Sequence, residues 1–366
     1  MKATIITIFD LTANYGNRLQ NYAVQYVLEN MGFETESVSF LPDPLNFKCK
    51  VKHTLHKLTG YRMPGKKVFW KYGIPRQLVF RDFNKNYIKS VRMTNKKEIE
   101  NIETDFFVVG SDQVWNPAWY NESPLKKDLF LLTFAKDFQK VSFSASFGVE
   151  SLPDEWNGFF KNYLSRFNYI SVREKAGANI VKNLTGREAE VLIDPTMMLT
   201  SDEWMKISKP PKNTDCSRPY ILTYFLGGCS DERKKQIQKI ADENSLKIYS
   251  LLDGDQPDIY LSGPSEFIHL ISNAKLVVTD SFHACVFSFL FNKPFLVFNR
   301  EGKRQDMMSR IENLLDILSL QRKYVNSGCE NEIFECDYSE GFRRLEEERL
   351  KVKKFLKAAL NADNLK

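Results

Sequence analysis

His283 is the residue of this chain best placed for chemistry. It lies in Val277–Ala284, where an apolar run ends in polar groups before a helix-like segment, Cys285–Phe291, begins. Ligands bind at the carboxyl ends of strands in open α/β sheets, and helix N-termini there attract anions. A histidine titrates near neutral pH and suits proton transfer. The position predicts an active-site histidine, although a ring that only caps the helix or bonds a backbone carbonyl fits the same pattern.

Arg173 ends a second apolar strand, expected at Ile170–Val172. A guanidinium group binds a carboxylate or a phosphate through two parallel hydrogen bonds. The position therefore suggests an anion-binding arginine. An ion pair with Glu174 or another nearby acid is the structural alternative.

Three polar turns follow expected strands. Asn14–Ala23 lies where the first strand becomes the first helix, Gly110–Pro117 follows a buried strand, and Ser144–Gly148 ends another. Amide, carboxylate and indole groups together suit a sugar, whereas helix capping and plain turns are the structural alternatives. The predicted sugar-contacting residues are Asn14, Tyr15, Gly16, Asn17, Gln20, Ser111, Asp112, Gln113, Trp115, Ser144 and Ser146.

Two common kinds of ligand site are not indicated. The chain has neither a Gly-x-Gly-x-x-Gly fingerprint nor a P-loop lysine, so a dinucleotide or Walker-type site is a weak interpretation. Asp194 and Asp280 end strands of separate predicted domains, and no histidine stands near them in metal-ligand spacing. We predict no metal and no cofactor.

Composition is ordinary for a globular protein. Of the 366 residues, 43% are hydrophobic and 27% are charged, and no apolar run approaches the roughly 20 residues of a membrane span. The N-terminus lacks the features of a signal peptide, and the six cysteines include no Cys-x-x-Cys pair. These features predict a cytoplasmic protein with reduced cysteines.

The net charge of +6 hides a strong asymmetry. Phe47–Arg92 contains thirteen Lys and Arg residues and one acid, Asp82, so this segment carries +12 and the rest of the chain −6. An anionic membrane surface would attract such a segment, whereas a solvated basic loop is the usual alternative. Aromatic residues are interleaved, but no nucleic-acid motif is present, so we expect no nucleic-acid partner.

Alternating elements predict the fold. Buried strands separated by amphipathic helices imply mostly parallel sheets, and the length suits two domains. The fold class is therefore α/β: two doubly wound Rossmann-like domains facing each other across a cleft, followed by an amphipathic helix. The expected divisions are an N-terminal domain (1–205) with a basic insertion (47–92), a linker (206–218), a C-terminal domain (219–335) and a C-terminal helix (336–366).

Five segments together resemble the polysaccharide pyruvyl transferase family over most of the chain. They are Asn14–Ala23, Gly110–Trp115, Ser171–Glu174, Asp194–Thr196 and Asp280–His283, in the family's order. Each segment is weak alone, but the ordered set is specific. The resemblance implies a two-domain architecture like that of GT-B glycosyltransferases, in agreement with the alternating elements.

The resemblance also implies a reaction. Pyruvate passes from phosphoenolpyruvate to two hydroxyls of a sugar, in a bacterial capsule or exopolysaccharide or its lipid-linked precursor, and a cyclic ketal forms. Arg173 and His283 match the expected catalytic residues, with His283 as general acid. The C-terminal domain is the expected donor side and the N-terminal domain the acceptor side. Expected donor-binding residues are Arg173, Ser281, Phe282, His283, Arg300 and Arg304.

One position departs from the family. Several members have Arg-Leu-His or Arg-Phe-His where this chain has Ser281-Phe282-His283, so that Arg300, Lys303 or Arg304 must supply the missing cation, or the donor differs. Two alternatives stay open: a GT-B glycosyltransferase that uses a sugar nucleotide, and a non-catalytic protein that binds a glycan or a membrane. The basic segment favours an enzyme at the inner face of the membrane, with a lipid-linked acceptor.

Overall fold

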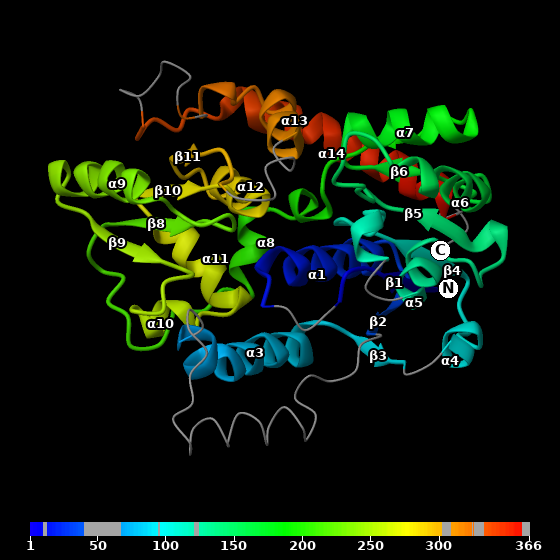
Figure 1. Ribbon diagram of the computed structural model, residues 1–366, viewed down its shortest axis with the longest axis horizontal. Coiled ribbons are helices and arrows are strands. Elements are labelled where there is room, and N and C mark those ends of the chain that lie inside the picture. The colour runs from blue at the N-terminus through cyan, green and yellow to red at the C-terminus, as the bar shows by residue number, and fades with distance from the viewer. Residues whose placement is uncertain are drawn as a thin grey trace.

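The fold is built on two parallel β-sheets, one in each half of the chain (Figure 1). The computed structural model describes residues 1–9, 13–39, 67–93, 96–120, 124–301, 309–323, 325 and 333–360. The predicted α/β class with two parallel sheets is confirmed. The domain boundaries expected from the sequence remain a prediction.

The first sheet has the strand order β3-β2-β1-β4-β5, with every neighbouring pair parallel. Its central strands are apolar because helices cover both faces, as is typical of parallel sheets. A two-stranded sheet, β6-β7, joins its edge through isolated bridges from Val141 to Tyr169 and from Ala145 to Val172. The strands are β1 (Lys2–Ile6), β2 (Glu34–Ser39), β3 (Ser90–Arg92), β4 (Phe106–Val109), β5 (Lys140–Ser142), β6 (Ser171–Val172) and β7 (Glu190–Val191).

The second sheet has the order β11-β10-β8-β9 and is also entirely parallel. Side chains alternate between its faces: Leu222 and Val277 face one core, whereas Ile221 and Val278 face another, with α9. The first of these cores continues into the first half, so one hydrophobic core spans both. The strands are β8 (Tyr220–Tyr224), β9 (Lys247–Ser250), β10 (Leu276–Thr279) and β11 (Phe295–Val297).

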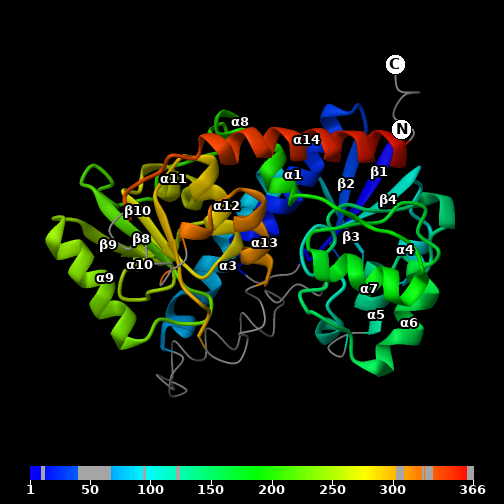
Figure 2. The same ribbon diagram turned by 90° about the horizontal axis from the view of Figure 1, so that it is seen from above.

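Helices cover both sheets, and α1 lies between the two halves (Figures 1 and 2). Asn14 caps α1, as its polar turn allows, through its side-chain oxygen and the backbone N–H of Asn17. The helices are α1 (Tyr15–Asn30), α3 (Lys67–Tyr87), α4 (Lys96–Glu100), α5 (Pro124–Phe130), α6 (Asp154–Leu164), α7 (Lys175–Thr185), α8 (Ser201–Met205), α9 (Asp231–Glu243), α10 (Pro257–Tyr260), α11 (Pro264–Asn273), α12 (Phe282–Leu290), α13 (Ser309–Ile317) and α14 (Ser339–Ala359). Short 3-10 helices are η1 (Pro117–Trp119), η2 (Asp137–Gln139), η3 (Pro195–Met198) and η5 (Gln321–Lys323).

Helix α3 occupies the second part of the basic segment and connects the two halves. The Arg76 guanidinium donates hydrogen bonds to the carbonyl of Tyr260, in the second half, and to the hydroxyl of Tyr15, in the first (3.0 Å for the latter). Phe80 and Phe83 are buried in the common core. This part of the segment is therefore a packed helix, whereas the sequence suggested a basic insertion. Residues 47–66 lie outside the described part of the chain.

Helix α14 makes a second connection, running from the second half to the first in both views (Figures 1 and 2). Its Phe342 stacks on Phe289 of α12, and its Phe355 meets Tyr169 beside the first sheet. Between these contacts, buried Arg349 donates to the carbonyls of Met197 and Leu199 at 2.8 Å each. The predicted amphipathic C-terminal helix thus ties the halves together. Among the described helices, none is long and apolar enough to cross a bilayer.

Candidate active site

A buried ion pair between Arg173 and Asp194 lies at the centre of the candidate site. The Nη1 atom of Arg173 is 2.6 Å from Oδ2 of Asp194, and both side chains are almost completely shielded from solvent. Burial acts to raise the pKa of Asp194, but Arg173, His283 and hydrogen bonds from Thr196 lower it to about 2. The carboxylate is therefore ionised throughout the physiological pH range.

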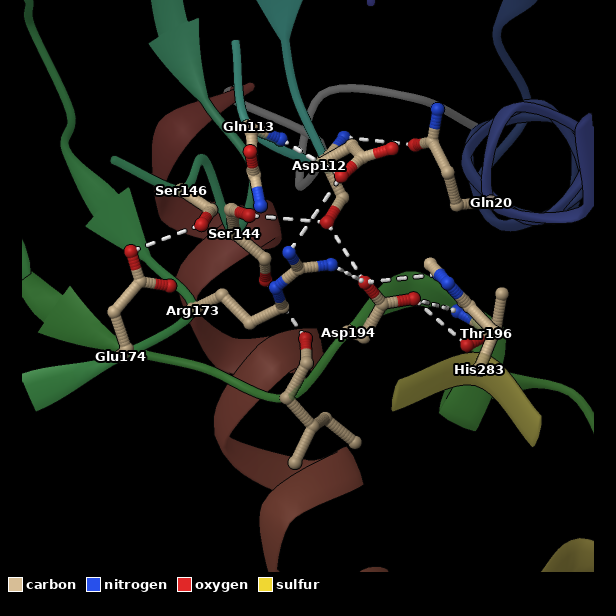
Figure 3. Close-up of polar contacts among 12 residues, drawn as sticks. Gln20, Asp112, Gln113, Ser144, Ser146, Arg173, Glu174, Asp194, Thr196 and His283 are labelled. Carbon is tan, nitrogen blue, oxygen red and sulfur yellow. Dashed lines mark hydrogen bonds and ion pairs between the residues drawn. The ribbon is translucent and has the colours of Figure 1, made fainter. Parts of the chain in front are cut away.

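Asp194 uses both carboxylate oxygens to join separate elements (Figure 3). Its Oδ1 atom accepts hydrogen bonds from the backbone N–H and the hydroxyl of Thr196, at 3.0 and 2.7 Å. Its Oδ2 atom accepts the hydroxyl of Ser111 at 2.9 Å, in addition to the arginine. The turn after β4, the arginine after β6 and the start of η3 are thereby held at one point.

Asp112 and Phe282 complete the surroundings of Arg173. Oδ1 of Asp112 lies 3.7 Å from Nη2 of Arg173, and Oδ2 accepts a hydrogen bond from the side-chain amide of Asn17. The phenyl ring of Phe282 faces the guanidinium carbon at 4.7 Å from the ring centroid, within range of a cation–π contact. Phe282 belongs to the second half and the other three residues to the first, so the site lies where the halves meet.

His283 reaches this network from the N-terminus of α12. Its Nε2 atom lies 3.9 Å from Oδ2 of Asp194 and has no hydrogen-bond partner among the described atoms. The side chain is only 9% exposed. Burial lowers the pKa of His283; Asp194 and Asp112 oppose this shift, and Arg173 and Arg310 reinforce it. The ring is therefore neutral at pH 7 when no ligand is bound, and its Nε2 is buried but not engaged in a hydrogen bond among the described atoms.

Gly16 leaves room for the imidazole ring of His283 because it has no side chain. The ring of His283 lies directly over the Cα atom of Gly16, near the N-terminus of α1, where any side-chain methyl would overlap Nδ1. The two helix N-termini, of α1 and α12, thus approach the same ring. The sequence suggested a polar turn at Gly16, and the structure brings this turn against the histidine of the other half.

The turn after β4 is held by the first helix. The side-chain oxygen of Gln20 accepts the backbone N–H of Ser111 at 3.0 Å, and its nitrogen donates to Thr7 at 2.6 Å. Gly110 has a φ of 120°, and a Cβ there would overlap the carbonyl of Phe143, so this position requires glycine. These contacts aim Ser111 and Asp112 at the site.

The serines after β5 support the loops rather than the network itself. The Ser144 hydroxyl donates to the carbonyl of Ile193 at 2.7 Å, next to Asp194. The Ser146 hydroxyl donates to Oε1 of Glu174 at 2.9 Å, on the far side of Arg173 (Figure 3). Both residues therefore hold the segments that carry Arg173 and Asp194.

Tyr15 and Trp115 lie inside the hydrophobic core. The Tyr15 hydroxyl donates to the carbonyl of Ser262 at 2.9 Å, and the Trp115 indole N–H donates to the carbonyl of Phe130 at 2.9 Å. Neither side chain reaches the surface, and the structure does not bring them into the network around Asp194. Their polar atoms are satisfied by backbone, as buried aromatic residues usually require.

The remaining predicted donor residues lie close to His283 in the chain. Ser281 is buried, and its backbone N–H donates to Thr279 at 3.0 Å. Arg300 pairs with Asp280, whose carboxylate also accepts the backbone N–H groups of Leu226 and Gly227 at 2.7 and 2.8 Å. Lys303 and Arg304 lie outside the described residues.

Arg310 is a site residue that the sequence did not reveal. It comes from α13, is 7% exposed, and binds the side-chain oxygen of Gln113 through Nη2 at 2.7 Å and Nη1 at 2.9 Å, with the amide oriented to accept. Asp194 was also missed as a site residue, since the sequence marks it only as a strand-end acid. No motif surrounds Arg310, and the only signal for Asp194 was its place in Asp194–Thr196.

The described residues contain no cluster of three or more potential metal ligands among His, Cys, Asp and Glu. The acids of the site are bound by arginine, serine, threonine and amide groups. The arrangement brings together a neutral histidine and two buried arginines. These features define a two-sheet α/β protein with a candidate active site between its halves.

Comparison with known proteins assigns the family. The family model for polysaccharide pyruvyl transferase matches residues 14–302, and the chain belongs to this family. No curated protein matches it. Similar solved structures include UDP-GlcNAc 2-epimerase from Neisseria meningitidis bound to UDP-GlcNAc (11% identity, 97% of this chain and 99% of that chain, TM-score 0.46). Another is Anabaena Alr3699/HepE in complex with UDP and glucose (10% identity, 98% and 100%, TM-score 0.49). At these values the likeness concerns the fold, and no functional argument rests on it.

Proposed function

We propose that the chain transfers pyruvate from phosphoenolpyruvate to two hydroxyls of one sugar residue, forming a cyclic ketal and releasing phosphate. The observation that supports this most is the meeting of Arg173 and His283, from different halves, around Asp194. The donor carries a phosphate and a carboxylate, which need cations, and a methylene carbon, which needs a proton. Arginine and histidine are the side chains that meet these needs.

His283 is the proposed general acid. Its free Nε2 is assigned to protonating the methylene carbon, which leaves an electrophilic carbon at C2. One sugar hydroxyl then adds to C2 and loses its proton. The bond between C2 and the bridging phosphate oxygen then breaks, and the second hydroxyl adds to C2, loses its proton and closes the ring. Of the two hydroxyl protons, one restores the acid form of His283 and the other leaves with phosphate as hydrogen phosphate, so the protons balance.

The protonation state of His283 fits this order of events. Burial keeps the ring neutral in the empty site, and the negative charge of a bound donor would favour its protonated form. Asp194 remains ionised beside it and stabilises the imidazolium that results. Proton uptake is therefore tied to donor binding, and the acid is charged when the donor is present.

The acceptor side is proposed to be the first half. Asp112, Asn17 and Gln113 stand next to Arg173, with amide and carboxylate groups that suit sugar hydroxyls. A lipid-linked acceptor at the inner face of the membrane would account for the basic segment 47–92, although Arg76 within it is buried and structural. The exposed basic residues in its described part, Arg81, Lys85, Lys89 and Arg92, would then help to hold the enzyme near anionic lipid.

Thermal denaturation with candidate donors tests the proposal, because a ligand that binds the folded state raises its stability. Phosphoenolpyruvate should raise the midpoint, whereas UDP-glucose and UDP-N-acetylglucosamine should not. Mass spectrometry of a sugar panel incubated with donor and enzyme should then detect the pyruvyl ketal together with free phosphate. A response only to the sugar nucleotides would favour the glycosyltransferase alternative, and no response to any donor would favour a non-catalytic protein.

A further inference from the structure

Arg310 differs from the other buried arginines of the site in what balances its charge. Its guanidinium bonds to a neutral amide oxygen, that of Gln113, and no described carboxylate lies within ion-pair distance of it. Its Nε atom is buried without a hydrogen-bond partner among the described atoms, as are Nε and Nη2 of Arg173, so the two arginines differ in their carboxylate contacts. A buried charge with no carboxylate in direct contact is costly, so such a group is expected to serve a ligand.

The charges around Arg310 agree with this. Burial lowers its pKa to about 10, and Arg173 and Arg300 act in the same direction, whereas Asp112 and Glu174 oppose them. Asp112 accepts a hydrogen bond from Asn17, whereas Glu174 accepts from Ser146 and neighbouring backbone N–H groups through Oε1 alone, and its Oε2 is buried without a partner among the described atoms. These two acids act on Arg310 without forming an ion pair with it, whereas Arg173 is in direct contact with Asp194.

Arg173 provides the contrast. Its Nη1 is bound by Asp194 at 2.6 Å, its Nη2 faces Asp112 at 3.7 Å, and the ring of Phe282 covers one face of its guanidinium group. Most of its charge is therefore already neutralised by carboxylates. An anionic ligand would gain less from Arg173 than from an arginine that has no carboxylate partner.

We propose that Arg310 binds an anionic group of the donor. Asp194 neutralises most of the charge of Arg173, and Arg310 supplies the positive charge that the donor then needs. The inference rests on the proposed function, since it identifies a further donor-binding residue of the same site. Arg310 is also a cation within the described residues that can replace the arginine that several family members have where this chain has Ser281. Arg300 is a weaker candidate, because Asp280 already pairs with it.

Four proteins test the inference: the parent, Arg310→Gln, Arg310→Lys and Arg187→Gln. Arg187 is a matched control, since it is a half-buried arginine whose guanidinium donates to the backbone carbonyls of Leu164, Ser165, Phe167 and Asn168, away from Asp194. Isothermal titration with phosphoenolpyruvate, and separately with inorganic phosphate, gives Kd at constant ionic strength. Thermal denaturation without ligand gives stability, and steady-state kinetics separates KM from kcat.

Arg310→Gln should weaken phosphoenolpyruvate binding about tenfold or more, as expected when a charged hydrogen bond is lost. KM should rise by a similar factor while kcat at saturating donor stays close to that of the parent. Without ligand the variant should be at least as stable as the parent, because an unpaired buried charge has been removed. Arg310→Lys should bind with intermediate affinity, since it keeps the charge but loses the planar fork. Arg187→Gln should be less stable and bind the donor normally.

The outcomes separate this inference from the proposed function. If the parent binds phosphoenolpyruvate and Arg310→Gln binds it equally well, the inference is overturned and the proposed function stands. If the parent binds phosphate but not phosphoenolpyruvate, and the variant loses phosphate binding, the anion site stands and the proposed donor is wrong. If the parent binds neither, both are overturned.

Discussion

Asp194, after β7, and Asp280, after β10, are both strand-end acids but have different surroundings. Each is a buried acid just after a strand, and each pairs with an arginine, Arg173 at 2.6 Å or Arg300 at 3.4 Å. Asp194 binds side chains from several elements, and His283 approaches it from the other half. Apart from Arg300, the carboxylate oxygens of Asp280 accept hydrogen bonds from two backbone N–H groups of a single turn.

The difference shows how the same residue type takes a structural or a chemical role. A carboxylate whose oxygens are saturated by backbone groups fixes a loop and has little left to offer a ligand. A carboxylate that is shared among side chains positions those side chains relative to one another. The first half therefore contributes the acid that organises the site, although the sequence pointed to the second half, through His283, as the donor side.

Replacing the two aspartates tests this contrast most directly. Asp194→Asn leaves Arg173 buried beside a neutral partner, and we expect a loss of about 3–5 kcal/mol in the free energy of unfolding. Asp280→Asn should cost less, about 1–3 kcal/mol, because its ion pair with Arg300 is longer, at 3.4 Å, and Arg300 keeps its hydrogen bond to the backbone carbonyl of residue 280. Denaturant titration measures both losses, and isothermal titration should show that Asp280→Asn keeps the parent's affinity for phosphoenolpyruvate. Equal destabilisation by the two changes would remove the distinction.

His283→Ala removes the proposed general acid. We expect kcat to fall about a hundredfold or more, with little change in the Kd for phosphoenolpyruvate or in stability, since the ring makes no hydrogen bond through Nε2 among the described atoms. Steady-state kinetics and isothermal titration check this. If turnover matches the parent, His283 serves only to pack against α1.

Gly16→Ala displaces the same ring without deleting it. The added methyl overlaps the imidazole, so we expect kcat to fall about tenfold, between the parent and His283→Ala, as is typical of a small misplacement of a reacting group. Gly158→Ala in α6 is the control, because no atom lies within 4 Å of the position that its added methyl would take. That variant should be unchanged in kcat and slightly more stable, by about 0.5–1 kcal/mol. Full activity in Gly16→Ala would show that the ring can move without cost.

The pH dependence should separate the free enzyme from the donor complex. Burial holds the pKa of His283 below its usual value in the empty site, so kcat/KM for a general acid should fall as the pH rises through this lowered pKa. Bound donor adds negative charge and raises the pKa, so kcat should begin to fall at a pH about one unit higher. Rate profiles between about pH 5 and 9 measure both. Coincident falling limbs would argue against coupled proton uptake.

The fold followed from the sequence because its signals are local. The apolar runs at β4 and β10 and the spacing of α1 predict buried strands and a covering helix without reference to distant residues. Helix α3 was hidden by its basic composition, although Phe80, Phe83 and Tyr87 recur on one helical face. The spacing of these three aromatic residues indicates a helix, but the basic charge of the segment favoured a loop.

The site was predicted only in part because its contacts are long-range. His283 and Arg173 stand out by residue type and position, but nothing local reveals that residues so far apart in the chain share Asp194. Trp115 has polar neighbours in the sequence, which suggested a ligand-binding surface. The structure instead buries its indole ring against Phe147 and Phe167. Arg310 has no informative neighbours, and only the packing of α13 brings it to the site.

The connection made by α3 has a consequence for synthesis of the chain. Arg76 finds its partner carbonyl at Tyr260, 184 positions later, and Phe80 and Phe83 are buried in a core that includes the second sheet. At about 5–20 residues per second, the helix leaves the ribosome roughly 10–40 s before these partners exist. Its aromatic residues can already pack against α1, through Tyr15 and Tyr22, but the surface that meets the second half is uncovered in the nascent chain, which is a state that chaperones bind and that otherwise aggregates. The first half therefore cannot reach its final packing co-translationally until most of the second half has been made.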